Sequence, residues 1–225
     1  AAFAAWIREF DGGGERPTVV LNADDAGIRE LAEALRAWDG RVVAVAVLDE
    51  AADAAARMVE LAAAFWTAAG PARAIVARWR SGAAGEGSLE IHGLERAVRG
   101  NLAARLALPG RHNAENGLVA AAVAVAAGAG PAAVCAGLAT FDGVGRRLEL
   151  KGEVGGVVVL DDYGHHPTAM AATFAAVAQR YPGRRLWAVY EPLTYHRTAA
   201  MLDAFAEVLG RADRAVIAQV HAGRD

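Results

Sequence analysis

The stretch from Val157 to Thr168 constrains the fold more than any other part of the chain. Its first four residues, 157–160, are apolar and have the length of a buried strand. Two aspartates, a tyrosine, a glycine and two histidines follow, and Pro167 then stands where a helix ending at Arg180 can begin. In an open α/β sheet, ligands bind beyond the carboxyl ends of the strands. This strand–loop–helix unit therefore predicts a functional loop.

The composition indicates a globular protein with a substantial core. The 225 residues are 55% apolar and carry a formal net charge of −3, which predicts neither a nucleic-acid surface nor a basic membrane face. No apolar run approaches the roughly 20 residues that span a bilayer. Residues 1–10 predict an amphipathic helix rather than a signal peptide. Cys135, the only cysteine, is expected to be a buried thiol, and the chain is expected to be cytoplasmic.

The use of lysine bears on nucleotide chemistry. Lys151 is the only lysine among 23 basic residues, and all the others are arginine. A Walker-type phosphate loop needs Gly-Lys followed by Ser or Thr. Glycine and glutamate follow Lys151, so this sequence contains no such loop.

Predicted strands alternate with predicted helices along the chain, which favours an α/β fold with a parallel sheet. A helix end is followed by Gly143, Gly145 and two arginines, and we place a domain boundary there, giving domains 1–143 and 144–225. Strands are expected at 18–21, 41–48, 74–79, 88–92, 101–108, 147–150, 156–160, 185–190 and 215–220. Helices are expected at 28–38, 51–69, 113–127, 131–140, 168–180 and 198–209, with a glycine-rich turn at 82–87.

Two asparagines, Asn113 and Asn116, stand at the start of a helix that is otherwise Ala-, Val- and Leu-rich. Residues three apart share a helix face. Backbone N–H groups at a helix N-terminus attract anions, and an asparagine amide can pair with a purine edge. Helix capping explains Asn113 equally well, but it does not explain Asn116. The pair therefore predicts a nucleotide contact.

The loop 161–166 has three interpretations. It is a capped βα turn, a metal site built on Asp161, Asp162, His165 and His166, or a substrate-binding loop. Adjacent histidines rarely face one metal ion together, so we predict no metal ligands in this loop. In the third interpretation, Asp162 orients an ammonium or a nucleotide and His165 donates to an anion.

Three further polar segments accompany these motifs. Arg146 and Arg147 are either a solvated face or a phosphate clamp. The segment 190–198 is a second strand end rich in polar and aromatic residues, in which Arg197 can bind a carboxylate. The segment 22–25, Asn-Ala-Asp-Asp, is expected to cap the next helix.

Taken in order, these motifs resemble the Mur ligase family. They are Asn-Ala-Asp-Asp at 22–25, Gly-Arg-His-Asn-x-x-Asn at 110–116, Phe-x-Gly-x-x-Arg-Arg at 141–147, Asp-Asp-Tyr-Gly-His-His-Pro-Thr at 161–168 and Pro-x-x-Tyr-x-Arg-Thr at 192–198. The resemblance implies the later part of a P-loop ATPase-like central domain, followed by a Rossmann-like domain of which this chain holds only a part. It also implies that the phosphate loop and the magnesium ligands lie outside the chain, so that these residues alone do not turn over.

The resemblance implies an ATP- and Mg²⁺-dependent ligase of peptidoglycan precursor synthesis. Its substrates are UDP-N-acetylmuramate and L-alanine, which are joined through an acyl phosphate. The family's nucleotide-binding positions correspond to His112, Asn113, Asn116, Arg147 and Asp162. Its catalytic positions correspond to Asp162, His165 and Arg147. The positions near the incoming amino acid and the acyl phosphate correspond to Tyr163, His165 and Arg197.

The chain departs from the family pattern at 191–194, where it has Glu-Pro-Leu-Thr and the family commonly has Gln-Pro-His-Arg. Glu-Pro at this point is a feature of the related ligase that recycles murein tripeptide, and that ligase is the alternative within the family. A different class is a metal-dependent hydrolase or a nucleotide-binding module that uses the loop Asp161–His166.

Overall fold

The computed structural model describes residues 2–9, 16–82, 86–94 and 102–220. Two compact units make up the protein: unit 1 comprises Ala1–Gly82 and Glu86–Phe141, and unit 2 is formed mainly by Asp142–Asp225. Parts of the predicted first helix, of the glycine-rich turn and of the strand beginning at Asn101 lie outside the described residues. Each unit is described by itself.

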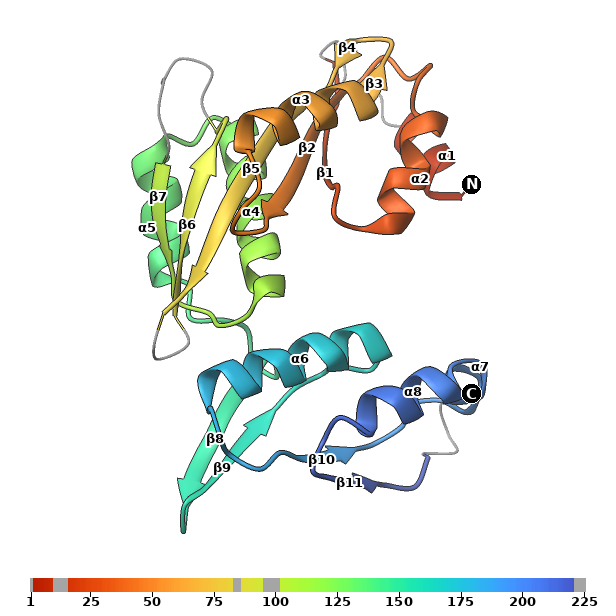
Figure 1. Cartoon of the computed structure of the whole chain (residues 1–225). Coiled ribbons are helices and arrows are strands. Elements are labelled where there is room, and N and C mark those ends of the chain that lie inside the picture. Colours follow the sequence, from red (N-terminus) through yellow and green to blue (C-terminus); the bar gives the residue numbers. More distant parts are fainter. Residues whose placement is uncertain (1, 10–15, 83–85, 95–101, 221–225) are drawn as a thin grey trace. The chain divides into compact units, whose positions relative to one another are not determined.

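Unit 1 is built on a five-stranded sheet with the order β1-β2-β5-β6-β7 (Figure 1). Strands β1, β2 and β5 are parallel, whereas β6 and β7 continue the sheet antiparallel. The elements are α1 (Ala2–Arg8), β1 (Thr18–Asn22), α2 (Ala26–Ala34), β2 (Arg41–Leu48), α3 (Ala54–Ala64), β3 (Trp66–Thr67), β4 (Gly70–Pro71), β5 (Arg73–Ser81), β6 (Gly87–His92), β7 (Leu102–Leu106), α4 (Arg111–Ala126) and α5 (Pro131–Thr140).

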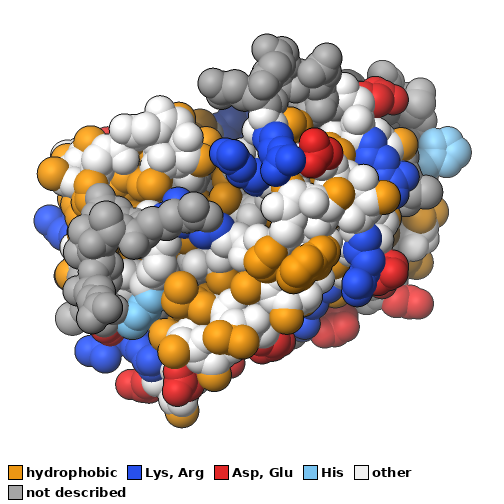
Figure 2. All heavy atoms as spheres, turned by 90° about the horizontal axis from the view of Figure 1, so that it is seen from above, with side chains coloured by type: hydrophobic (Ala, Val, Ile, Leu, Met, Phe, Trp, Pro, Cys, Tyr) orange, Lys and Arg blue, Asp and Glu red, His pale blue; other side chains and the backbone are white. Residues whose placement is uncertain are grey.

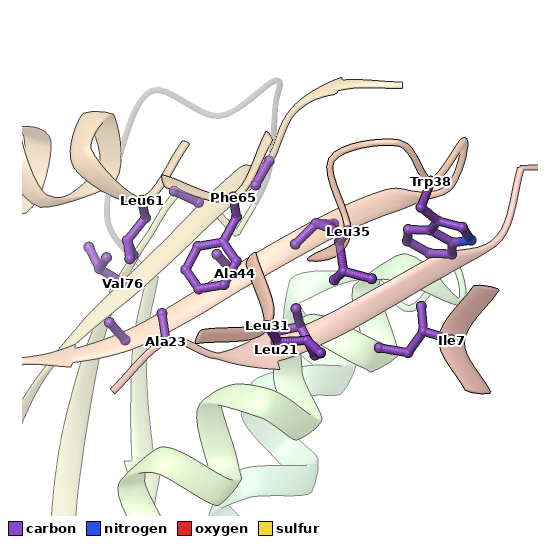
Figure 3. Packing of buried hydrophobic residues seen from close by; sticks show 14 of the residues in the cluster. Ile7, Leu21, Ala23, Leu31, Leu35, Trp38, Ala44, Leu61, Phe65 and Val76 are labelled. Carbon is purple, nitrogen blue, oxygen red and sulfur yellow. The ribbon is translucent and has the colours of Figure 1, made fainter. Parts of the chain in front are cut away.

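Strand β2 is the centre of the unit 1 core, because both of its faces are buried. Its even-numbered residues join a cluster with α2 and α3, in which the Phe65 ring lies beside Ala44 and Leu61 lies beside Val76 (Figure 3). Its odd-numbered residues join a second cluster with α4 and α5, which contains the fully buried Leu118. Helices therefore cover both faces of the sheet, and burying one such leucine contributes about 1.5–3 kcal/mol.

Aspartates begin two of the unit 1 helices. The Asp25 carboxylate accepts the Ile28 N–H at 3.0 Å and caps α2, which confirms the capping predicted for 22–25. Asp53 caps α3 in the same way, accepting from the first-turn N–H groups of Ala55 and Ala56. These caps fix where the chain leaves the carboxyl ends of β1 and β2.

In its described residues, unit 2 contains two strand pairs and three helices. Helices α6 and α8 pack over β10, with a core that includes Met170, Ala188, Tyr190, Phe205 and Val208 (Figure 1). The elements are β8 (Glu149–Val154), β9 (Val157–Asp161), α6 (Pro167–Arg180), β10 (Trp187–Tyr190), α7 (Tyr195–Ala200), α8 (Leu202–Leu209) and β11 (Arg214–Ile217).

The α/β class predicted from the sequence is confirmed, but the main sheet is mixed rather than parallel, and the helix expected at 51–69 ends at Ala64. Two further details differ in unit 2. Strands β8 and β9 pair antiparallel, because Gly155 and Gly156 have φ of 59° and 77° and so form a tight hairpin turn. Parallel pairing would have needed a crossover connection. The helix expected at 198–209 is two helices, since the chain leaves helical geometry at Met201 with φ −126° and ψ 24°.

The molecular surface carries charges of both signs. Among the coloured residues of Figure 2, basic and acidic side chains are interspersed with hydrophobic and neutral ones, and neither sign covers this face alone. Within the part of the chain that the structure describes, no helix is long and apolar enough to cross a membrane.

Candidate functional site

The Asp162 carboxylate is the centre of the predicted loop in unit 2. Its Oδ2 accepts the backbone N–H of Leu148 at 3.0 Å, and its Oδ1 accepts the backbone N–H of Gly164 at 2.7 Å. The Thr173 hydroxyl on α6 donates to the same Oδ1 at 3.2 Å. One side chain thus fastens the segment before β8, the loop after β9 and the following helix. Sequence reasoning missed Thr173, because its role depends on a contact across 11 residues.

The segment before β8 holds an uncommon backbone conformation. Arg146 and Leu148 have φ of 60° and 50°, which lie in the left-handed region. Such residues cost of order 1–3 kcal/mol each and persist where the surrounding structure fixes them. Here the Leu148 N–H is held by Asp162, and the Arg146 carbonyl accepts the Tyr163 N–H at 2.8 Å.

The two neighbouring arginines have different partners. The Arg146 guanidinium lies 3.5 Å from a carboxylate oxygen of Asp161 and 4.8 Å from the centre of the Tyr163 ring. The Arg147 guanidinium lies 6.0 Å from that ring centre, and it is exposed and has no ion pair among the residues described. Arg147 is therefore the arginine of the pair whose charge is free to bind an anion.

The two histidines of the loop have separate roles. His165 Nδ1 lies 3.0 Å from the Tyr163 carbonyl, and the two rings meet edge to face at 5.3 Å. His166 Nδ1 accepts the Thr168 N–H at 3.3 Å and caps α6, with Pro167 at the first turn as predicted. Tyr163, His165 and Arg147 therefore form one cluster, and His166 serves the helix start.

The metal interpretation of this loop finds no support in its geometry. Both Asp162 oxygens accept hydrogen bonds from protein donors, and His166 is turned to its own helix. Within the described ranges, no group of three His, Cys, Asp or Glu side chains is arranged to hold a metal ion.

Helix α4 of unit 1 presents the predicted asparagine pair. The helix begins after Gly110, whose φ is 92°, so Asn113 is not the N-cap that capping would have required. Instead the Asn113 amide donates back to the Pro109 carbonyl at 2.7 Å, while its Oδ1 has no partner in the described part of the chain. Asn116 is exposed, and its amide makes no hydrogen bond within the described residues. Half-buried His112 lies in the same turn.

Arg111, the first residue of α4, is a site residue that the sequence reasoning missed. Its Nη2 donates to the Val47 carbonyl at 2.6 Å, its Nη1 lies 3.1 Å from Asp49, and its Nε lies 3.2 Å from Glu115. Burial raises the pKa of the Glu115 carboxyl above its ordinary value, the Arg111 charge opposes this, and the nearby Asp24 charge adds to it.

Arg197 lies on α7, after the second predicted loop. Thr194 caps this helix by accepting the Arg197 N–H at 3.3 Å. The Arg197 guanidinium is exposed and has no acidic partner among the residues that the structure describes. Burial raises the pKa of Tyr190, at the end of β10, and the Arg197 charge acts in the opposite direction.

The predicted site residues are thus divided among three places. Tyr163, His165, Asp162 and Arg147 cluster in unit 2, and Asn113 and Asn116 lie with His112 on unit 1. Arg197 is also in unit 2, on α7, but no hydrogen bond or ion pair joins its side chain to the loop after β9 in the described ranges. Strands β9 and β10 belong to separate strand pairs there.

Comparison with solved structures first defines the class. The chain is similar to the UDP-N-acetylmuramate–alanine ligase of Thermotoga maritima, with a TM-score of 0.57 and 19% identity, covering 86% of this chain and 41% of that one. It is also similar to a murein peptide ligase of Psychrobacter arcticus, with a TM-score of 0.56 and 26% identity, covering 90% and 44%. Folylpolyglutamate synthase of Thermotoga maritima shares the fold, with a TM-score of 0.57 at 17% identity, covering 92% and 48%. The fold is thus that of Mur ligases and folylpolyglutamate synthases.

Sequence comparison then gives matches at higher identity. Residues 146–225 match the model described as Mur ligase, glutamate ligase domain. The UDP-N-acetylmuramate–L-alanine ligase of Agathobacter rectalis is 45% identical over 121 residues, which cover 54% of this chain and 26% of that protein. The enzyme of the same name from Variovorax paradoxus is 47% identical over 124 residues, covering 52% and 26%. The resemblance to the Mur ligase family is therefore confirmed, with a match that spans about a quarter of each curated relative.

Proposed function

We propose that this chain is part of an ATP-dependent ligase that joins L-alanine to UDP-N-acetylmuramate in peptidoglycan precursor synthesis. The observation that carries the proposal is the 45% identity over 121 residues to a protein named for this activity. The geometry agrees with it, because the exposed Arg147 and Asn116 groups suit phosphate and purine partners.

Each site residue then has a chemical task. Asn113 and Asn116 hold the adenine end of ATP, with His112 beside them. Arg147 neutralises charge on the transferred phosphoryl group, as arginines do in phosphoryl transfer. Tyr163, His165 and Arg197 orient the incoming amino acid and the acyl phosphate. The Asp162 carboxylate holds the loop that carries Tyr163 and His165.

The proposed reaction has two steps. A carboxylate oxygen of UDP-N-acetylmuramate attacks the γ-phosphorus of ATP, and ADP leaves with formation of an acyl phosphate. The amine nitrogen of L-alanine then attacks the acyl carbon, phosphate leaves, and the amide is formed. The residues of this chain contribute mainly by positioning and charge neutralisation. Mg²⁺ supplies further neutralisation when bound, and we propose that its ligands and the phosphate loop lie in sequence that this chain does not contain.

A second substrate is favoured by one observation. Glu191 and Pro192 replace the family's common Gln-Pro, and the murein peptide ligase of Psychrobacter arcticus is a structural neighbour at 26% identity. The amine substrate of the ligase therefore has two candidates, L-alanine and murein tripeptide, each joined to UDP-N-acetylmuramate.

A chimera tests the proposal and separates these candidates. The segment of the Agathobacter rectalis ligase that matches this chain is replaced by the corresponding residues of this chain, and phosphate release is measured with each amine substrate. We expect release that requires ATP, UDP-N-acetylmuramate and L-alanine together. Phosphate release that occurs with murein tripeptide but not with L-alanine, in the presence of ATP and UDP-N-acetylmuramate, would identify the recycling ligase instead. A folded chimera that is inactive with both amines would contradict the proposal.

Residues 1–225 by themselves are expected not to hydrolyse ATP, since the sequence has no Gly-Lys-Ser/Thr loop. They are still expected to bind ADP through Asn113 and Asn116. Binding is measured by isothermal titration calorimetry, with Asn116→Ala as the variant that loses it.

A further inference from the structure

Arg111 joins the start of α4 to the carboxyl end of β2. Its hydrogen bond to the Val47 carbonyl, at 2.6 Å, bridges 64 residues of sequence. The Asp24 carboxylate accepts the Val47 N–H at 2.7 Å, and the same Oδ2 lies 3.9 Å from Arg111. Arg111 and Asp24 therefore hold both backbone polar groups of one residue of β2.

The position of Arg111 next to His112 and Asn113 suggests a phosphate ligand, but its partners argue otherwise. Three carboxylates surround its guanidinium: Glu115 at 3.2 Å, Asp49 at 3.1 Å and Asp24 at 3.9 Å. An arginine neutralised by three acids has little charge left for an anion. Its fork is committed to the protein, so its contribution is geometric.

The first turn of α4 has no side-chain cap, and the Arg111 contact is made from this turn. Gly110 precedes the helix with φ 92° and supplies no side-chain cap. The asparagines of the turn provide no anchor to the sheet, since Asn113 donates to Pro109 four residues back and Asn116 is exposed. Arg111 is thus a first-turn side chain that hydrogen-bonds this end of α4 to a neighbouring strand.

We propose that Arg111 is a positioning residue for adenine-nucleotide binding, which fixes the face of α4 that carries Asn113 and Asn116 against the carboxyl end of β2. The inference rests on the proposed function and deepens it. Arg111 touches no nucleotide. It fixes the positions of the two asparagine amides relative to the bound purine. Hydrogen bonds between the amides and the purine weaken steeply when the amides are displaced.

Arg57 provides a matched control. Its guanidinium lies 3.7 Å from Asp24 Oδ1 and 2.5 Å from Glu60, so it shares the Asp24 carboxylate but reaches it from α3. Arg57→Ala removes a positive charge and two ion pairs, one of them with the shared Asp24, and it leaves the tie between α4 and β2 in place. A role limited to neutralising the shared Asp24 carboxylate would affect the two variants alike.

The experiment measures the dissociation constant of ADP for residues 1–225 by calorimetry, in the wild type, Arg111→Ala, Arg111→Lys, Arg57→Ala and Asn116→Ala. The side-chain amide signals of Asn113 and Asn116 are followed by NMR in the same samples. Thermal unfolding of each variant is measured first, and binding is then compared at one temperature at which all the variants are folded.

We expect Arg111→Ala to weaken ADP binding about tenfold or more, which corresponds to about 1.4 kcal/mol. Arg57→Ala should change it less than about twofold, and Arg111→Lys should restore part of the loss because a lysine can still donate to the Val47 carbonyl. The two asparagine amide signals should shift on ADP addition in the wild type and broaden in Arg111→Ala.

The outcomes separate the inference from the function it rests on. Folded Arg111→Ala that binds ADP as the wild type does overturns the inference alone, and so does an equal loss in Arg57→Ala. Wild-type chain that binds no ADP overturns the proposed nucleotide site, and the inference fails with it.

Discussion

Asp162 and Leu148 are 14 residues apart in the sequence, yet the Asp162 carboxylate accepts the Leu148 N–H at 3.0 Å. This bond holds a residue whose φ is 50°, beside a second left-handed residue, Arg146. The same carboxylate binds Gly164 and Thr173. The backbone position of Arg147, which lies between the two left-handed residues, therefore depends on Asp162.

Replacing Asp162 with alanine should destabilise unit 2. The change leaves two backbone N–H groups and one hydroxyl without their acceptor, and an unsatisfied donor costs about 1–3 kcal/mol. Thr173→Val removes one of the three bonds and should cost about 0.5–1.5 kcal/mol. Hydrogen exchange of the Leu148 and Gly164 amides, measured by NMR, checks both values.

Glu207→Gln is the control for the variants Asp162→Ala and Thr173→Val. Glu207 is exposed and contacts Arg211, which follows the C-cap of α8, so its loss should change stability by less than about 0.5 kcal/mol. Unchanged amide protection in Asp162→Ala would show that the left-handed turn is held by other contacts.

Gly164→Ala should also disturb this carboxylate. A Cβ at this position would lie 2.7 Å from Asp162 Oδ1, the atom that accepts from Gly164 and Thr173. Either the loop or the carboxylate has to move, at a cost of about 1–3 kcal/mol. The matched control is Gly145→Ala, whose Cβ would meet nothing nearer than Glu149 at 3.7 Å. Urea unfolding of both variants tests this, and equal midpoints would contradict the crowding argument.

The sequence predicts those features of the fold that depend on local signals. Asp25 as a helix cap and Pro167 at a helix start were both predictable, because each acts within a few residues of itself. The strand–loop–helix pattern around 157–168 was predictable for the same reason. The antiparallel hairpin also had a local signal, the pair Gly155–Gly156, which was outweighed by the expectation of parallel strands.

The contacts that organise the site had no such signal. Arg111 binds Asp49 and Val47, which are 62 and 64 residues away in the sequence. The partners of Asp162 on either side of its loop likewise follow from tertiary folding. The motifs therefore point to exposed polar residues such as Arg147 and Asn116, whereas the contacts that hold their segments in place emerge only from the structure.

Glu115 should make the stability of unit 1 depend on pH. Its pKa is raised, chiefly by burial, so the folded state favours the neutral carboxyl. Its contribution to stability is then complete below the unfolded-state pKa and is lost as the pH rises through the higher folded-state value. Glu115→Gln stays neutral, so we expect it to be more stable than the wild type at pH 7, by less than about 1 kcal/mol, and to lose this advantage in acid.

Thermal unfolding of the wild type and Glu115→Gln at several pH values between pH 4 and 7 measures this difference. The Arg111 charge opposes the shift, so the gain from Glu115→Gln should be larger when Arg111 is alanine. A variant that is less stable than the wild type to the same extent at every pH would show that the ion pair outweighs burial.

Arg197 should control the ionisation of Tyr190 if its charge reaches the end of β10. Burial raises the pKa of Tyr190, whose ring stacks on Phe205 at 5.2 Å, and the positive charge of Arg197 lowers it. Removing the charge with Arg197→Gln leaves burial unopposed, so the pKa should rise further above its ordinary value. NMR of ¹³C-labelled tyrosine during an alkaline titration resolves Tyr190 from the other three tyrosines. Arg211→Gln, whose partner is Glu207 on α8, should leave the Tyr190 titration unchanged. A Tyr190 pKa that is equal in both variants would mean that Arg197 points away from the strand end and does not face the position proposed for the incoming amino acid.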